Sequence, residues 1–229
     1  MFSFYVNNPN NFTIQTDYTV IPFGHRCTSA IACKYANIRK FSLPFDWTSP
    51  TLPKKIQNIL ENNFTDFIPD VYNDNFFNKY DICLVHFNKN LQTGIEEYKR
   101  RIERFNNIIH LPNHKYFVYI NEDYFYNSCC RQDDFNNNIF QEMLDLEIFL
   151  KNKYPNLNYN ILYFNFKHHN IPNNSNIINI VLSSNKLYEL EKDTPIEEVE
   201  EFRIFCGKIL TEIFNTNLTL GQEYDVYNN

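Results

Sequence analysis

The chain has 229 residues, of which 43% are hydrophobic and 17% are aromatic, enough for one sizeable core without disulfide or metal support. A formal net charge of −6 argues against broad binding to nucleic-acid phosphates, because such binding depends on clustered Lys and Arg. The one basic cluster, at 99–104, alternates with glutamates as on a solvated helix face. With only 4 glycines, no flexible joint divides the chain, so we expect a single domain over 1–229.

The N-terminal residues and the cysteines indicate where the protein works. The start MFSFYVNNPNN has neither the basic region nor the apolar run of a signal peptide, and no segment is apolar for the length of a membrane span. The 6 cysteines are scattered, as is typical of thiols in a reducing compartment. The excess of Asn, Ile, Lys, Tyr and Phe is typical of an AT-rich genome. We therefore expect a cytoplasmic protein, in the host cytoplasm if the source is viral, with no membrane partner.

Short apolar runs alternate with amphipathic stretches along the chain. The predicted strands cover 18–23, 82–87, 116–120, 158–166 and 177–182, and the predicted helices cover 27–38, 52–62, 93–109, 136–153 and 195–214. This alternation is typical of an α/β fold with a mostly parallel, doubly wound sheet of about five strands and helices on both faces. Because no helix is predicted between the last two strands, we expect them to be antiparallel at one edge.

The turn after the first predicted strand reads Gly24-His25-Arg26-Cys27. Ligands of open α/β sheets bind beyond the carboxyl ends of the strands, which is where this turn is expected to lie. Gly24 allows a positive φ where the chain reverses, and the next helix presents unpaired N–H groups and the positive end of its dipole. Such a turn can hold an anion or lower the pKa of a thiol. Cys27 is therefore the candidate nucleophile, and the other three residues are candidates for substrate binding.

His86 lies near the end of the second predicted strand, on the same rim of a parallel sheet as Cys27. A cysteine and a histidine are the minimum set for activation of a thiolate by an imidazole. The group that orients the imidazole comes from Asn121 or Asp123 after the third strand, or from Asp46 on the loop after the first helix. A buried histidine bonded to a carbonyl, and a cysteine that only packs, are the structural alternatives.

The loop after the first helix carries Asp46 and Trp47 shortly after Pro44, which stiffens it. A Trp beside a carboxylate can stack on a sugar or base while the carboxylate binds hydroxyl groups. The alternative is that Phe45 and Trp47 anchor the loop to the core. Trp47 is thus a further candidate for substrate binding.

No spacing in the sequence indicates a metal or a cofactor. His110 and His114 are separated by Pro112, which prevents them from sharing a helix face, and the adjacent cysteines at 129 and 130 lack the spacing of a zinc site. No Walker A, G-x-S-x-G or G-x-G-x-x-G pattern occurs. We therefore expect no metal and no cofactor.

Two segments together resemble a family of bacterial and large-DNA-virus proteins described as papain-like cysteine peptidases. The segments are VIPFGHRC at 20–27 and RKFSLPFDW at 39–47, and the family pattern is Ser-Leu-Gly-x-x-Cys, an apolar helix, Ser-x-Pro-Phe-Asp-Trp and a later strand carrying His. Pro22-Phe23 stands where the family has Ser-Leu. The resemblance covers 17–120, and its matching positions are Gly24, Cys27, Arg39, Ser42, Pro44, Phe45, Asp46, Trp47 and His86.

The turn and the resemblance together favour a cysteine-dependent hydrolase or transferase that acts on a peptide, glycan or small molecule. In this hypothesis Cys27 is the nucleophile, His86 the base, and helix N–H groups at 27 and 28 stabilise an oxyanion. A second hypothesis is a non-catalytic or glycan-processing module that binds a nucleotide sugar or glycan through His25, Arg26, Asp46 and Trp47. A third is a viral interaction protein with no small ligand, which would show a large exposed apolar patch. The oligomeric state is not predicted.

Overall fold

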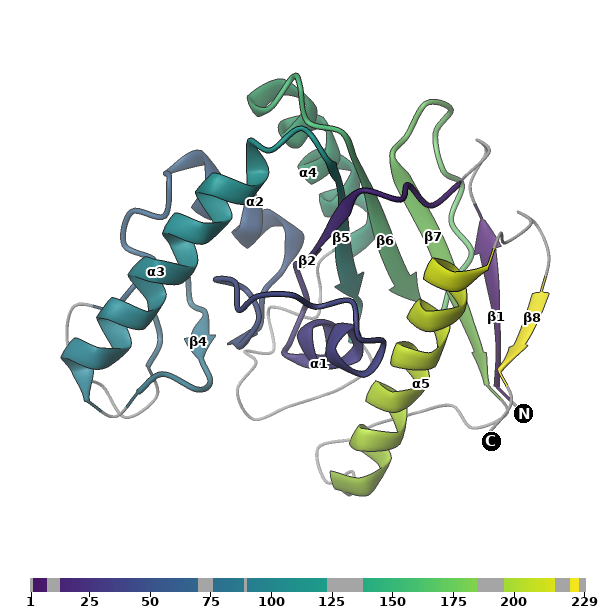
Figure 1. The fold of residues 1–229 in the computed structure, drawn as a ribbon, viewed down its shortest axis with the longest axis horizontal. Helices are drawn as coiled ribbons and strands as arrows, with labels where there is room; N and C mark the ends of the chain where they lie inside the picture. The colour runs from purple at the N-terminus through teal and green to yellow at the C-terminus, as the bar shows by residue number, and fades with distance from the viewer. Residues whose placement is uncertain are drawn as a thin grey trace.

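The computed structural model describes residues 2–7, 13–69, 76–88, 90–122, 138–184, 196–216 and 223–226. Its main sheet has six strands in the order β2-β5-β6-β7-β1-β8 (Figure 1). The parallel strands are β2 (Tyr18–Pro22), β5 (His114–Ile120), β6 (Tyr159–Asn165) and β7 (Ile177–Ser184). The chain termini contribute β1 (Phe2–Asn7), antiparallel to β7, and β8 (Glu223–Val226), antiparallel to β1. The predicted α/β class with a mostly parallel sheet is confirmed.

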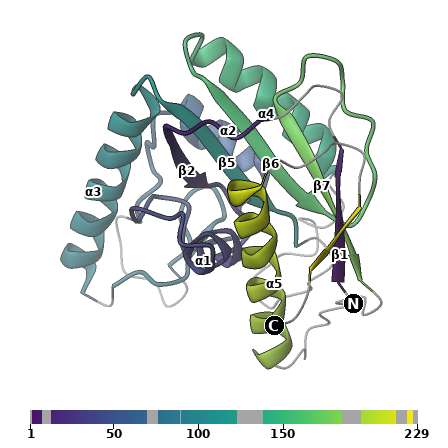
Figure 2. The same cartoon turned by 45° about the vertical axis from the view of Figure 1, so that its right-hand side comes forward.

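Helices cover both faces of this sheet, as predicted (Figure 2). On one face lie α2 (Pro53–Glu61), α3 (Leu91–Ile109) and α4 (Ile139–Lys153), and on the other lie α1 (Thr28–Tyr35) and α5 (Ile196–Asn215). Within β5, Phe117 and Tyr119 pack toward the first group of helices, while Tyr116 and Val118 pack toward the second. Both sides of the strand are therefore buried, which explains its continuous apolar run. No helix in the described ranges is long and apolar enough to cross a membrane.

The expected antiparallel pairing of the strands at 158–166 and 177–182 is wrong. β6 and β7 are parallel, with Ile161 opposite Ile177 and Asn165 opposite Val181. The connection of residues 166–176 has no helix, but an extended chain of this length reaches roughly 36 Å, farther than a seven-residue strand. It can therefore return to the start of the next strand. The antiparallel edge of the sheet comes from β1 and β8 instead.

The predicted strand over 82–87 is also wrong. Only β4 (Cys83–Leu84) is a strand there, and it pairs with β3 (Thr48–Ser49) in a separate two-stranded sheet. Ile82, Leu84 and Phe87 are buried against the core, whereas Val85 and His86 are exposed. An apolar run alone does not distinguish a strand from a loop that covers a core. Leu52, three residues after β3, caps the N-terminus of α2.

Candidate functional site

The loops after β2 and β5 lie side by side at the carboxyl edge of the sheet. The pairing of these strands continues into the loops, because Phe23 N donates to the Val118 carbonyl (2.9 Å). On the other side of β5, Asn121 N donates to the Phe164 carbonyl (2.9 Å). The turn at 24–27 and the residues after β5 are therefore held together by backbone hydrogen bonds. α1 begins at this edge (Figure 1).

Gly24 is required for space, and not for the positive φ that was predicted; its φ lies outside the left-handed region. A Cβ at this position would lie 2.3 Å from the Arg26 carbonyl oxygen and 2.8 Å from Ser29 Oγ. Ser29 Oγ in turn accepts a hydrogen bond from Ile120 N (3.1 Å). The turn is thus folded tightly onto the start of α1, and α1 is tied to the end of β5.

His25, a predicted substrate-binding residue, lies under the turn with only 1% of its surface exposed. Its Nδ1 accepts a hydrogen bond from Glu122 N (3.3 Å), the Asn121 side chain hydrogen-bonds to its ring, and its carbonyl accepts from Thr51 N (2.8 Å). Burial, aided by the charge of Arg26, lowers the pKa of His25 to about 3. The ring is therefore neutral at physiological pH and joins three loops. With Nδ1 as acceptor, its proton is on Nε2.

Cys27 caps the N-terminus of α1 and is 9% exposed. Its Sγ accepts a hydrogen bond from Nη2 of Arg203 (3.4 Å). Burial and the charge of Glu122 raise the pKa of Cys27, and the opposing effects of Arg203 and Arg26 do not overcome them. The predicted lowering of this thiol's pKa is therefore wrong, because desolvation and a nearby carboxylate outweigh the two arginines.

Glu122 is the carboxylate beside this thiol, and 1% of it is exposed. Its Oε2 pairs with Nη1 of Arg26 (3.4 Å), and the Thr28 side chain hydrogen-bonds to this carboxylate. Burial raises the pKa of Glu122 against the effects of Arg26, Thr28 and Arg203. Sequence reasoning passed over this residue, although an acidic side chain directly after a buried strand was the available signal.

Arg203 reaches the thiol from α5, far along the chain. Its Nη1 pairs with Glu200 (3.1 Å), and its Nε is buried without a partner. Nothing in the sequence of α5 distinguishes this arginine from others on an amphipathic helix. We use the name Cys27 site for Cys27 together with Arg26, Thr28, Glu122 and Arg203.

His86, the predicted base, is exposed on the loop after β4. Its ring meets Trp47 edge-on at 5.1 Å, and the guanidinium of Arg39 lies 5.5 Å from the centre of the Trp47 ring. None of the recorded contacts or charges of Cys27 involves His86 among the described residues. Two predicted site residues, His86 and Trp47, therefore contact each other, but neither has a recorded contact with the thiol of Cys27.

Asp46, a predicted orienting group, is fully buried and holds its own loop. Its Oδ2 accepts hydrogen bonds from Nε (3.0 Å) and Nη2 of Arg39 and from Leu43 N (3.0 Å). Nη2 of Arg39 also donates to Ser42 Oγ (3.0 Å). Three positions of the family pattern, Arg39, Ser42 and Asp46, therefore form a staple, which we name the Arg39–Asp46 staple. Burial raises the pKa of Asp46 in spite of Arg39.

Asn121, the other predicted orienting group, lies beside His25 and not beside His86. Its Nδ2 donates to the Tyr163 hydroxyl (3.4 Å), and its side chain hydrogen-bonds to the His25 ring. The predicted site residues outside the Cys27 site and Gly24 thus fall into three places: Asn121 with His25, Asp46 with Arg39, and His86 with Trp47. Cys27 shares its surroundings with predicted Arg26 and with two residues that were not predicted.

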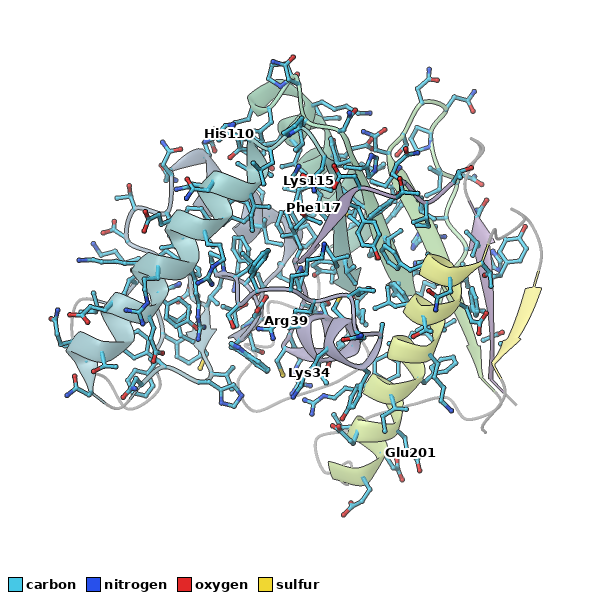
Figure 3. The ribbon with its side chains drawn as sticks, viewed as in Figure 1. Lys34, Arg39, His110, Lys115, Phe117 and Glu201 are labelled. Carbon is cyan, nitrogen blue, oxygen red and sulfur yellow. The ribbon has the colours of Figure 1, made fainter. Side chains whose placement is uncertain are left out.

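His110 and His114 lie apart from the Cys27 site, at the end of α3 and the start of β5. His110 lies near Lys115 at the amino-terminal edge of the sheet, opposite the edge at which α1 begins (Figure 3). In the part of the chain that the structure describes, no three His, Cys, Asp or Glu residues form a group that could hold a metal. Asp123 and the cysteines at 129 and 130 lie outside the described residues.

Comparison with known proteins agrees with the resemblance at the N-terminal part of the chain. No curated protein and no solved structure gives a match. A family model of unknown function, described as "Putative papain-like cysteine peptidase", matches residues 18–73. This segment includes the turn at 24–27 and the Arg39–Asp46 staple, but neither Glu122 nor Arg203. The region from β2 through α2 is therefore similar to that family of papain-like cysteine peptidases.

Proposed function

We propose that the protein is a cysteine-dependent hydrolase or transferase in which Cys27 attacks an acyl carbon of the substrate. The observation that carries this proposal is the enclosure of one sulfur, at the start of α1, by a buried carboxylate and two arginines. Buried polar atoms are nearly always hydrogen-bonded, yet Nε of Arg203, whose Nη2 donates to the sulfur, lacks a partner here. Unused hydrogen-bonding capacity around a nucleophile is what a substrate would fill.

Glu122 is the group best placed to accept the thiol proton. Its raised pKa brings a carboxylate closer to the range of an effective base at neutral pH. When the S–H bond breaks and the proton joins Glu122, the negative charge that opposed ionisation of Cys27 disappears. The thiolate then keeps Arg203 as its neighbour.

The start of α1 supplies the second part of the mechanism. The N–H groups of Thr28 and Ser29 precede the first intrahelical hydrogen bond, from Ile31 N to the Cys27 carbonyl (3.0 Å), so they have no partner within the helix. As the S–C bond forms, negative charge develops on the carbonyl oxygen, and these N–H groups stabilise it. The proton on Glu122 passes to the leaving group, and in the hydrolytic branch the carboxylate then takes a proton from the attacking water.

His86 is the alternative base. Because its ring packs on Trp47, it would reach Cys27 only if the loop that carries it moved. The charge of Glu122, in contrast, already acts on the thiol in this conformation. We therefore assign proton transfer to Glu122 and test both residues.

The other two hypotheses have less support. Asp46 is buried and bound by Arg39, so it presents no accessible oxygen to a sugar hydroxyl. An interaction protein would expose a large apolar patch. The exposed large hydrophobic side chains of the described residues are spread over different elements; they are Tyr35, Phe41, Val85, Leu111, Ile148 and Ile204.

The nucleophile is tested with p-nitrophenyl acetate. We expect a burst of nitrophenol stoichiometric with the protein, followed by slow turnover, and an acetyl group on Cys27 in the peptide mass map. Cys27→Ser should lose the burst. Cys83→Ser is the matched control, because Cys83 is a partly exposed thiol outside the site, and it should keep the burst. Acetylation of Cys83 with none on Cys27 would contradict the proposal.

The proton acceptor is tested with Glu122→Gln. Loss of the negative charge lowers the pKa of Cys27, so iodoacetamide at pH 7 should label this thiol faster than in the wild type. Steady-state hydrolysis after the burst should nevertheless be slower, because no group takes the proton from water, and Glu122→Asp should recover part of it. A merely structural role would change both rates in the same direction. Loss of hydrolysis in His86→Gln, with Glu122→Gln unaffected, would return the role to His86.

A further inference from the structure

A cavity of about 380 Å³ lies between α3 and the loop that follows α1. Its lining has four cationic side chains and one carboxylate, with Phe41 and Ser42 completing the wall. None of these residues belongs to the Cys27 site. The charged lining residues are Lys40, Glu97, Arg100, Arg101 and Arg104.

The contribution of α3 comes from one face of the helix. Glu97, Arg100, Arg101 and Arg104 have the spacing i, i+3, i+4 and i+7, which places them together. The sequence suggested a solvated face on which glutamates neutralise the basic cluster, but Glu97 and Arg101 form the one recorded ion pair among these lining residues, at 4.0 Å. Arg100 forms no ion pair with any described residue. The cavity therefore has an excess of positive charge.

Two of the guanidinium groups are held in place. Nη1 of Arg104 donates to the Ser42 carbonyl (2.5 Å), and its guanidinium lies 6.0 Å from the centre of the Phe41 ring. The Arg101 guanidinium lies 4.6 Å from the centre of the Tyr98 ring. Side chains that are already ordered lose little entropy when a ligand binds. The cavity thus presents fixed donors, which favours a specific anion over a diffuse cloud of counter-ions.

The hydroxyl group of Ser42 adds a donor to the wall. Its oxygen accepts a hydrogen bond from Nη2 of Arg39 (3.0 Å), so its own hydrogen is available for an oxygen of a ligand. Through this contact the cavity is connected to the Arg39–Asp46 staple, whose geometry is fixed by buried hydrogen bonds. One wall of the cavity is therefore built on a rigid part of the fold.

We propose that this cavity binds a compact anion with two linked phosphate groups, either inorganic diphosphate or the diphosphate of a nucleotide. Guanidinium groups bind phosphate oxygens through paired, charge-assisted hydrogen bonds. A single phosphate group carries only about −1.5 to −2 at neutral pH, so it would leave part of the positive charge of the four cations uncompensated. A long nucleic acid is disfavoured, because the protein as a whole has a net charge of −6.

Calorimetric titration of the full-length protein with inorganic diphosphate tests the proposal. We expect one site per chain, with weaker binding of phosphate and of sulfate. Lys40→Gln combined with Arg100→Gln should weaken the affinity by about 100-fold, since each of the two lost charge-assisted contacts is worth roughly 1.5 kcal/mol, about tenfold. Both residues are exposed, so we expect the variant to fold, and its melting temperature checks this.

Lys99→Gln is the matched control, because Lys99 is an exposed cation on α3 that does not line the cavity. It should change the affinity less than about 2-fold. Cys27→Ser should bind as the wild type does, whatever the outcome at the Cys27 site. Tighter binding of ADP than of inorganic diphosphate would assign a nucleotide, and equal affinities would assign the diphosphate group alone.

Three results would overturn the proposal. One is no heat of binding with either diphosphate ligand, and another is equal weakening in Lys99→Gln and in the double variant. The third is binding of single-stranded oligonucleotides that grows with their length and exceeds the binding of ADP.

Discussion

The turn at 24–27 and the Arg39–Asp46 staple lie in the same family-matched segment, but their buried polar groups are in different states. In the staple, one carboxylate oxygen of Asp46 accepts three hydrogen bonds, from Arg39 and from Leu43 N. At the Cys27 site, Glu122 has a looser ion pair, at 3.4 Å, with Arg26. The staple also has an unpaired atom, because Oδ1 of Asp46 is buried without a hydrogen bond, so the two places differ in how firmly the other carboxylate oxygen is held. A charge held by several short hydrogen bonds stabilises a fold, whereas a loosely paired charge can also bind a ligand.

This difference predicts that the staple stabilises the fold, whereas the turn at 24–27 controls the reactivity of Cys27. We expect changes in the staple to affect the stability of the protein without changing the reactivity of Cys27. Changes around the turn should affect that reactivity. Each variant below is therefore measured in two ways, by urea unfolding and by the rate at which iodoacetamide labels Cys27.

Asp46→Ala should have the largest effect on stability. It leaves the largely buried Arg39 and the Leu43 N–H without their acceptor, which costs about 3–5 kcal/mol of unfolding free energy. The control is Lys79→Met, which breaks the exposed pair between Lys79 and Asp66 (2.9 Å) and should cost less than about 1 kcal/mol. Labelling of Cys27 in the folded protein should be unchanged. Similar losses of unfolding free energy in the two variants would show that the staple stabilises the protein no more than an ordinary surface ion pair does.

His25 should make the protein less stable as the pH falls. Its pKa is about 3 in the folded protein against 6.5 for an ordinary histidine, so below pH 6.5 the unfolded chain takes up a proton that the folded protein does not. The contribution of His25 is complete above pH 6.5 and is lost toward pH 3, by up to about 1.4 kcal/mol per pH unit.

The measurement is the difference in unfolding free energy between wild type and His25→Gln from pH 7.5 down to pH 4.5. A difference is needed because burial raises the pKa values of Glu122 and Asp46, and these carboxyl groups favour the folded state as the pH falls. We expect the wild type to lose stability relative to the variant. Parallel curves would show that the ring is accessible to protons in the folded protein.

Gly24→Ala should cost about 1–3 kcal/mol, because the new Cβ would lie 2.3 Å from the backbone oxygen of Arg26. The obstacle is backbone and cannot rotate away, so the turn has to open. Urea unfolding measures the loss of stability. In contrast to Asp46→Ala, this variant should also change the labelling rate of Cys27. An unchanged labelling rate would show that the geometry of the turn does not determine the environment of the thiol.

Arg203→Gln should have the smallest effect on stability but slow the labelling of Cys27 several-fold at pH 7. The guanidinium of Arg203 lowers the pKa of the thiol, so its removal reduces the thiolate fraction. Glu200→Gln is the control, since Glu200 contacts Arg203 but is not among the charges acting on Cys27. Faster labelling in Arg203→Gln would mean that this arginine blocks access to the sulfur instead of stabilising its charge.

Much of the fold follows from patterns within short stretches of sequence. The helix predicted over 93–109 is α3 (Leu91–Ile109), and the one predicted over 136–153 is α4 (Ile139–Lys153), because an apolar face of period 3.6 is a local property. β1 and β8 were not predicted, since short strands at the chain ends form only where a partner edge is present. The parallel direction of β7 relative to β6 likewise depends on the path of the connection at 166–176, which the sequence does not show.

Within the candidate site, the sequence by itself determined that Arg26 and Cys27 follow a buried strand and begin a helix. Only the tertiary structure decided which groups surround the thiol: Glu122 comes from the end of β5 and Arg203 from α5. It also decided that His25 is neutral and that the pKa of Cys27 is raised. The physical reason is that secondary structure depends on neighbours along the chain, whereas desolvation and charge depend on every group nearby in space.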